Sequence, residues 1–229
     1  MTLRLENAST QRHDLQLVRA VASHTLEELL RHVGSENAPL EPWTRSGGGI
    51  GTVGPGGSAD VTLDLQLGTY WYFSTERIGG DAGPLQAVHG MAGEVTVEGT
   101  SGATLPRAPA SLVLGEHSIV PERLGPGLNQ VRLSNDGAMP HNALFLPVAP
   151  GATFEQATQA LASDKPAALP PPIDFDSVVS VAAFDPGQRA VVSLDLRPGT
   201  YAVVCLLPDP GTTEPSHLRK GMATELRVG

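Results

Sequence analysis

Residues 199–222 read Gly199-Thr-Tyr-Ala-Val-Val-Cys-Leu-Leu-Pro-Asp-Pro-Gly-Thr-Thr-Glu-Pro-Ser-His-Leu-Arg-Lys-Gly-Met222. The first residues of this segment alternate as in a β-strand, with Tyr201, Val203 and Cys205 on one face. A loop rich in proline and glycine follows, and the alternation resumes in Thr224-Glu-Leu-Arg-Val228. The pattern predicts two strands joined by a long loop.

The side chains of this loop include groups that bind soft metal ions. Cys205 is the only cysteine of the chain, and His217 and Met222 follow it. A thiolate, an imidazole and a thioether together suit copper that alternates between Cu(I) and Cu(II). A blue-copper geometry needs a second imidazole, so a further histidine must come from elsewhere in the chain.

The segment Asn135-Asp-Gly-Ala-Met-Pro-His-Asn-Ala-Leu-Phe-Leu146 offers that second imidazole. Residues 130–134 alternate like a strand, and the Asn-Asp-Gly that follows is typical of a turn. His141 then opens the next predicted strand. The candidate ligands therefore lie at the ends of predicted strands.

These segments resemble the cupredoxin, or blue copper, family in its plastocyanin-like form. The run from Asn135 to Asn142 is similar to the segment that bears the family's first histidine. Four residues separate His217 from Met222, as in plastocyanin-like proteins. The chain departs from the small electron carriers in the eleven residues between Cys205 and His217, which make a longer loop.

The resemblance implies one mononuclear type 1 copper per chain and one-electron transfer with a protein redox partner. Cys205 would be the strong thiolate ligand, with His141 and His217 as equatorial imidazoles and Met222 as the long axial ligand. The second nitrogen of His141 is expected to be held by a neighbouring group. The resemblance favours an electron carrier over an enzyme.

Composition and charge narrow the class of protein. The 26 glycines and 20 prolines, spread between short alternating segments, predict many strands and turns and hence an all-β fold. A net charge of −9 argues against nucleic-acid binding and permits steering toward a basic partner. A single cysteine excludes an internal disulfide and a dinuclear CuA-type copper site, which needs two thiolates.

The sequence carries no targeting or membrane signal that can be recognised. The start, Met1-Thr-Leu-Arg-Leu-Glu-Asn7, has no apolar region, and no stretch approaches about eighteen apolar residues. Neither a signal peptide nor a membrane span is therefore expected in the chain as given. The family is mostly exported, so the resemblance implies an exported or periplasmic protein if the chain is N-terminally shortened, and the compartment is otherwise open.

The first half of the chain repeats the second. Short matches recur at an offset of 128 and then of 131 residues. They are Leu3-Arg-Leu-Glu-Asn7 with Val131-Arg-Leu-Ser-Asn135, His13 with His141, Gly68-Thr-Tyr70 with Gly199-Thr-Tyr201, and Gly90-Met91 with Gly221-Met222. A repeat of this length predicts two copies of one domain, at residues 1–104 and 105–229.

We therefore predict two tandem cupredoxin-like Greek-key β-sandwiches, each with a short helical insert. The inserts are predicted to begin at Thr25 and Thr153, because a Glu or Gln three residues later completes a capping box. A loop follows each insert, glycine-rich at Ser46-Gly-Gly-Gly49 and proline-rich at Leu169-Pro-Pro-Pro172. Both loops are expected to be solvent-exposed connections, with a partner-binding surface as the alternative.

The first copy lacks strands that the second has. Strands predicted near Ala110-Ser-Leu-Val-Leu114 and Gln130-Val-Arg-Leu133 precede the histidine strand of the second copy, whereas the first copy begins at the equivalent of Val131. The first domain should therefore expose a sheet edge, and an open edge favours pairing with another chain. We expect homo-oligomers formed through that edge.

The metal site of the first copy is expected to be degenerate. Ser74 stands where Cys205 does, and a hydroxyl is a poor ligand for copper. His89 lies two residues before Met91, too close to match the loop histidine of the second copy. The first domain is interpreted as a scaffold or docking surface, with a weak Cu(I) site of His13, His89 and Met91 as the alternative.

Two other classes of function stay open. One is a metal-free or copper-carrying binding module, and the other is a multicopper oxidase or reductase with a second metal between subunits. None of the seven histidines forms a His-x-His pair, and His24, His32 and His117 are expected at the surface. A hydrolase built on Cys205 and His217 would lack any marked oxyanion hole.

Overall fold

The computed structural model of the chain describes residues 1–21, 23–35, 41–80, 82–99, 104–163, 171–213 and 215–229. Strands dominate, which confirms the all-β class. The first half contains β1 (Thr2–Glu6), β2 (His13–Arg19), β3 (Ser46–Val53), β4 (Ser58–Leu63), β5 (Gly68–Phe73) and β6 (Ala92–Val97). The second half contains β7 (Ala110–Gly115), β8 (Ser118–Glu122), β9 (Gly127–Asn135), β10 (His141–Pro147), β11 (Val179–Phe184), β12 (Arg189–Leu196), β13 (Gly199–Val204) and β14 (Ala223–Val228).

The helical elements of the described chain are short. They are α1 (Leu26–Val33), α2 (Phe154–Ala162) and the 3-10 helices η1 (Gln86–His89), η2 (Phe175–Ser177) and η3 (His217–Lys220). Both predicted capping boxes are confirmed: the side chains of Thr25 and Thr153 each accept a hydrogen bond from the backbone N–H three residues later. In the described part of the chain, no helix is long and apolar enough to cross a membrane.

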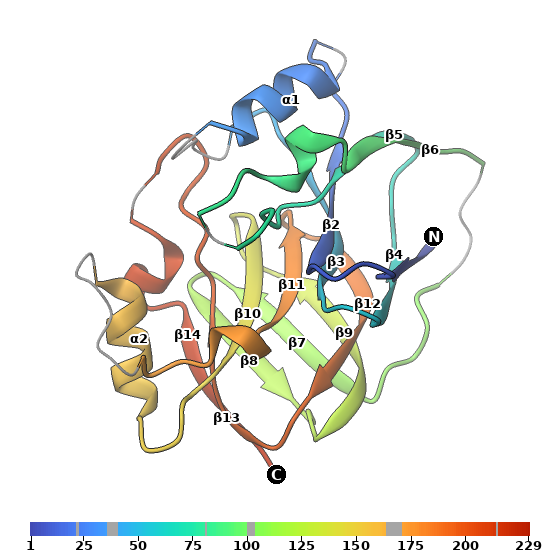
Figure 1. Cartoon of the computed structure of the whole chain (residues 1–229). Helices are drawn as coiled ribbons and strands as arrows, with labels where there is room; N and C mark the ends of the chain where they lie inside the picture. Colours follow the sequence, from blue (N-terminus) through green and yellow to red (C-terminus); the bar gives the residue numbers. More distant parts are fainter. Residues whose placement is uncertain (22, 36–40, 81, 100–103, 164–170, 214) are drawn as a thin grey trace.

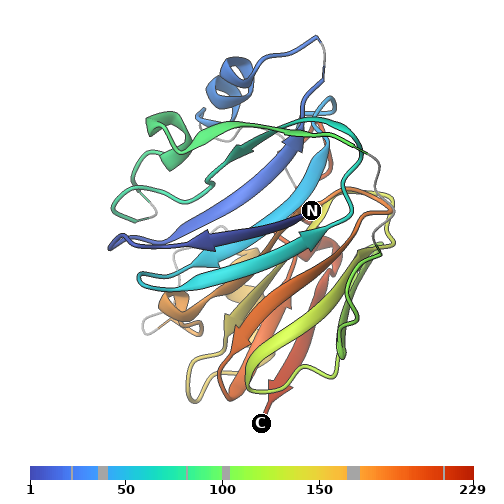
Figure 2. The same cartoon turned by 90° about the vertical axis from the view of Figure 1, so that its right-hand side faces the viewer.

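The strands form two sheets, and each sheet runs through both halves of the chain. The six-stranded sheet has the order β1-β4-β12-β9-β7-β8, and the eight-stranded sheet has the order β14-β13-β10-β11-β3-β2-β5-β6. The halves meet where β4 pairs with β12 and where β3 pairs with β11. Figure 1 labels these elements, and Figure 2 shows the blue to green strands of the first half above the light green to red strands of the second. Buried apolar side chains of both halves form one continuous core.

The same strand pairings occur in both halves. β2 pairs with β3 and β5, and β5 pairs with β6. In the second half β10 pairs likewise with β11 and β13, and β13 pairs with β14. The second half adds β7 and β8 beside β9. Within the described residues, β1 has β4 as its only strand partner and ends the six-stranded sheet.

The glycine-rich segment Ser46–Gly49 is not a solvent-exposed loop, so this prediction is wrong. These residues begin β3 and are buried. A Cβ on Gly48 would lie 2.3 Å from the Phe184 ring, so glycine is what lets β3 lie against β11 here. Because the glycines have no side chains, the alternation that marks a strand is hidden. The other predicted loop, Leu169–Pro172, begins among residues outside the described ranges.

Candidate metal centre

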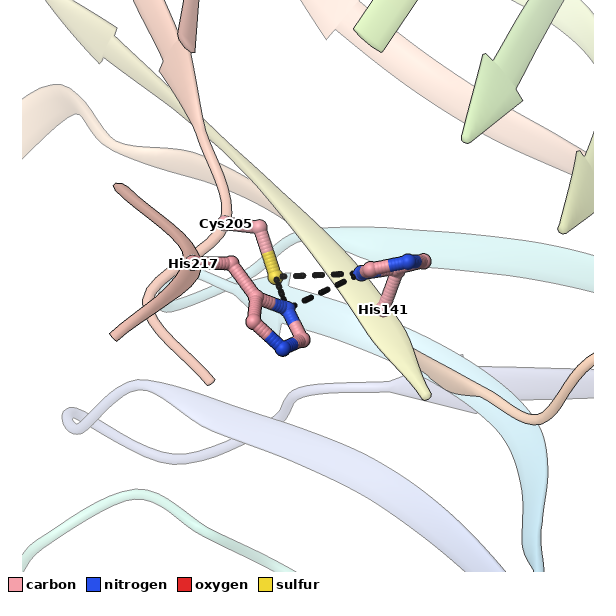
Figure 3. Close-up of side chains that lie close together, drawn as sticks. All are labelled: His141, Cys205 and His217. Carbon is pink, nitrogen blue, oxygen red and sulfur yellow. Dashed lines mark hydrogen bonds between the residues drawn. The ribbon is translucent and has the colours of Figure 1, made fainter. Parts of the chain in front are cut away.

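Three of the four predicted ligand residues lie together at one end of the second half. His141 opens β10, Cys205 follows β13, and His217 opens η3. Nδ1 of His141 lies 3.0 Å from Nδ1 of His217, and Cys205 Sγ lies 3.4 Å from His217 Nδ1 and 3.8 Å from His141 Nδ1 (Figure 3). All three residues are fully buried. Two imidazole nitrogens and one sulfur therefore face the same small space, away from water.

A buried asparagine fixes the loop that leads to His141. Asn135 donates from Nδ2 to the carbonyl oxygens of Met139 and Phe184, at 2.8 and 2.7 Å. Its Oδ1 accepts a hydrogen bond from the Gly137 N–H at 3.0 Å. Because these bonds join the loop to itself and to the end of β11, they fix the point at which β10 begins.

Backbone hydrogen bonds tie the two ends of the long loop together. The Cys205 carbonyl accepts from the Leu218 N–H at 2.8 Å, and the Cys205 N–H donates to the Met222 carbonyl at 3.2 Å. The Met222 N–H donates to the His217 carbonyl at 2.9 Å, and the Met222 side chain is fully buried. Met222 thus belongs to the same hydrogen-bonded frame as Cys205 and His217.

The thiol of Cys205 is suited to a metal rather than to nucleophilic attack. Burial raises its pKa to about 11, and hydrogen bonds from the backbone amides of Asn142 and Leu207 act in the opposite direction by stabilising the thiolate. Reactive cysteines are partly exposed and have a lowered pKa. The full burial of Cys205 therefore argues against the hydrolase alternative, whereas a metal ion can displace its proton.

The two histidines of this cluster are both held in the neutral form. Burial lowers the pKa of His141 to about 4, with a further contribution from the nearby His217. Burial also lowers the pKa of His217. Both imidazoles are therefore uncharged at neutral pH, which a metal ligand requires. The donor set of two imidazoles and one thiol fits copper in its soft, redox-active form.

The lowered pKa of His141 should make the metal-free protein sensitive to acid. The folded state binds fewer protons than the unfolded state between pH 6.5 and 4, so stability is full above this window and falls as the pH drops through it. We expect this residue alone to remove about 3 kcal/mol of unfolding free energy between pH 7 and pH 4. Urea unfolding of the wild type and of His141→Gln at both pH values measures this loss of unfolding free energy. An equal loss in the two proteins would contradict the prediction.

The outer nitrogen of His141 is not held as expected. Among the described residues no hydrogen-bond partner reaches His141 Nε2, so the prediction of a fixing contact there is wrong. Gly137 packs against this nitrogen instead, and a Cβ on Gly137 would lie 2.7 Å from it and 3.1 Å from the Gly115 carbonyl carbon. The ring is therefore held by the close approach of backbone.

Gly137→Ala should displace the His141 ring, because backbone on the far side leaves the new methyl group no room. We expect copper affinity to fall at least about tenfold, as for a lost supporting contact, and stability to fall by about 1–3 kcal/mol, as for overpacking. Metal competition and urea unfolding measure both effects. Gly125→Ala is the matched control, since a Cβ there meets nothing within 4 Å.

The outer nitrogen of His217, in contrast, has a charged partner. His217 Nε2 lies 3.1 Å from Asp209 Oδ1, and Lys220 Nζ donates to Asp209 Oδ2 at 2.6 Å. The His117 ring packs edge-on against the His217 ring, with 5.6 Å between centroids. The ligand atoms of His117, Asp209 and His217 lie within 4.8 Å of one another, but the Lys220 ammonium opposes a second cation there.

The sequence interpretation missed two residues beside the candidate metal centre, Asp209 and His117. The Asp-Pro-Gly turn within the long loop is a local signal for Asp209. His117 was expected at the surface, yet it reaches the centre from the turn between β7 and β8, and nothing in the sequence marks that approach.

The first half carries a polar cluster where the second has its candidate ligands. His13 Nδ1 lies 2.6 Å from Gln86 Oε1, and Ser74 Oγ donates to the same oxygen at 3.0 Å. Gln86 lies 131 residues before His217, so the repeat offset itself identifies it as the counterpart. His89 and Met91 are exposed, and His13 faces Gln86 rather than either of them.

The chain thus combines a two-sheet β fold with a buried cluster of His141, Cys205 and His217. No protein-family model matches the chain, and no curated protein matches it. Among solved structures it is similar to the dithionite-reduced auracyanin from the photosynthetic bacterium Roseiflexus castenholzii, with 20% identity over 52% of this chain and 94% of that chain and a TM-score of 0.33. It is also similar to the blue copper oxidase from Nitrosomonas europaea, with 15% identity over 99% of this chain and 72% of that chain and a TM-score of 0.25.

Proposed function

We propose that His141, Cys205, His217 and Met222 hold one type 1 copper ion and that the protein carries single electrons to and from a protein partner. The observation that carries this proposal is that two imidazole nitrogens and one sulfur meet in a buried space. Two backbone amides there stabilise the thiolate form of that sulfur. The buried thioether of Met222 supplies the weak fourth donor that favours copper over zinc.

Bound copper would supply the one-electron chemistry, and the protein would supply a fixed and dry setting for it. The hydrogen bonds of Asn135 and the backbone bonds from Cys205 to Met222 keep the ligand residues in place. Full burial of His141, Cys205 and His217 excludes water. A frame that resists rearrangement suits a carrier, because neither oxidation state then requires the ligands to move.

The first half is proposed to be a scaffold or docking domain, and the chain to self-associate through the edge of β1 that pairs with no strand of the described residues. The support is the position of β1 at the end of the six-stranded sheet. An uncovered edge offers unpaired backbone groups to another chain. Light scattering over a range of concentrations tests this, and a monomer at the highest concentration would exclude it.

The central experiment is a titration of the reduced, metal-free protein with Cu(II), followed by visible absorption and by bound-metal analysis. We expect an intense blue band that saturates at one copper per chain, disappears on addition of a reductant and returns on reoxidation. A folded protein without the band would favour the metal-free binding module. Additional non-blue copper would favour the oxidase or reductase.

A further inference from the structure

The long loop between Cys205 and His217 has a defined structure. Asp209-Pro-Gly-Thr212 form a turn in which the Thr212 N–H and hydroxyl both donate to the Asp209 carbonyl, at 3.1 and 2.8 Å. Pro210 and Gly211 occupy the two central positions, and Gly211 has a φ of 78°, a backbone conformation that favours glycine. The turn fixes the backbone of Asp209, the residue that the extra length of the loop supplies.

The side chain of Asp209 reaches the outer edge of the buried His217. A carboxylate only accepts hydrogen bonds, so the 3.1 Å contact requires that His217 Nε2 carry the proton. Nδ1 is then the free lone pair of the ring, and it is the atom that faces Cys205 and His141. The opposite carboxylate oxygen accepts from Lys220, which holds Asp209 from the other side.

We propose that Asp209 and Lys220 are positioning residues that fix the tautomer of His217 and set the reduction potential of the centre. The proposal rests on the proposed copper function. It adds a role for the extra length of the loop between Cys205 and His217, in which this chain differs from the small electron carriers. A carboxylate bonded to a metal-binding imidazole makes that imidazole a stronger donor. The negative charge of Asp209 favours the more positive copper state and lowers the potential, and the positive charge of Lys220 raises it.

The two residues should therefore shift the potential in opposite directions. Asp209→Asn keeps an oxygen that can accept from His217 but removes the charge. We expect the preference for Cu(II) over Cu(I) to fall about tenfold, a rise of about 59 mV for one electron. Lys220→Gln should lower the potential, since Asp209 is then no longer neutralised. Asp195→Asn is the control, because it makes the same charge change at an exposed position of β12. Asp195 precedes the start of β13, whereas Cys205 follows its end, so the two lie at opposite ends of that strand.

A redox titration of the copper-loaded variants measures these shifts. Opposite signs for Asp209→Asn and Lys220→Gln, with Asp195→Asn close to wild type, support the proposal. Shifts of the same sign, or shifts no larger than that of the control, overturn it. If the two residues had a purely structural role, the sign of the shift in potential would not depend on the sign of the charge that is removed.

A second measurement needs no copper and separates failure of this proposal from failure of the proposed function. Nitrogen-15 NMR of the metal-free and Zn²⁺-loaded full chain reports which ring nitrogen of His217 is protonated. We expect a protonated Nε2 with slow proton exchange in the wild type and in Asp209→Asn, and fast exchange in Asp209→Ala. A wild-type His217 protonated on Nδ1 without metal would overturn the proposal even if copper binds as expected.

Discussion

Replacing Cys205 with serine is expected to abolish the blue band and to lower copper affinity by more than the roughly 100-fold that loss of a supporting group causes. A hydroxyl is a hard, weakly acidic donor and a poor ligand for copper. The substitution leaves almost the same volume in a fully buried site, so the fold should survive. Visible absorption and competition with a chelator of known affinity measure the two effects.

The number of protons released on copper binding is an independent measure of the effect of Cys205→Ser. The thiol of Cys205, with a pKa of about 11, is protonated at pH 7, and His141, with a pKa of about 4, is not. Wild type should therefore release one proton per copper bound, and Cys205→Ser should release none. The control is Ser74→Ala in the first half, which should leave both the band and the proton count unchanged. A blue band in Cys205→Ser would mean that this sulfur is not a ligand.

Features set by neighbouring residues were predictable from the sequence. The capping boxes at Thr25 and Thr153 are confirmed because a cap needs only a side chain and a backbone N–H three residues away. The alternation around Tyr201 and Val203 likewise predicts one strand face, and these residues do lie in the core between the sheets. Cys205 and His217 lie at the two ends of one loop, so their proximity also had a local basis.

Apart from His141, which the family resemblance predicts beside Cys205, features that depend on contacts between distant segments were not predictable. His117 contacts His217 because the fold brings the turn after β7 beside η3, which is distant in the sequence. The start of β3 is predicted as a loop because its glycines show no alternation of apolar and polar side chains. The absence of side chains is also what lets β3 lie against Phe184. The repeat indicated two similar halves, but their joining into continuous sheets depends on the pairing of β3 with β11 and of β4 with β12.

We propose that the two halves are copies of one domain and that close backbone packing makes them unfold together. Ser180 of β11 joins Thr52 of β3, donating to its hydroxyl at 3.0 Å and accepting from its N–H at 2.8 Å. Gly51 lies beside this contact, and a Cβ there would lie 1.8 Å from the Ser180 carbonyl oxygen. Backbone on β11 cannot move aside as a flexible side chain could, so any side chain at position 51 must push the strands apart.

Gly51→Ala should therefore destabilise the protein by about 3 kcal/mol or more, at or above the upper range for overpacking. Gly54→Ala is the matched control just after β3, since a Cβ there meets nothing within 4 Å. We expect it to change stability by less than about 1 kcal/mol. Urea unfolding followed by fluorescence and by thiol labelling measures both variants and distinguishes the halves.

The two signals report on different halves because both tryptophans, Trp43 and Trp71, lie in the first and the only cysteine, Cys205, lies buried in the second. In wild type the fluorescence change and the exposure of the thiol should coincide, as for one cooperative unit. In Gly51→Ala they should separate, because opening the β3–β11 contact lets one half unfold before the other. Coincident transitions in Gly51→Ala at wild-type stability would mean that the β3–β11 contact does not couple the halves, and the pairing of β4 with β12 would then have to carry that role alone.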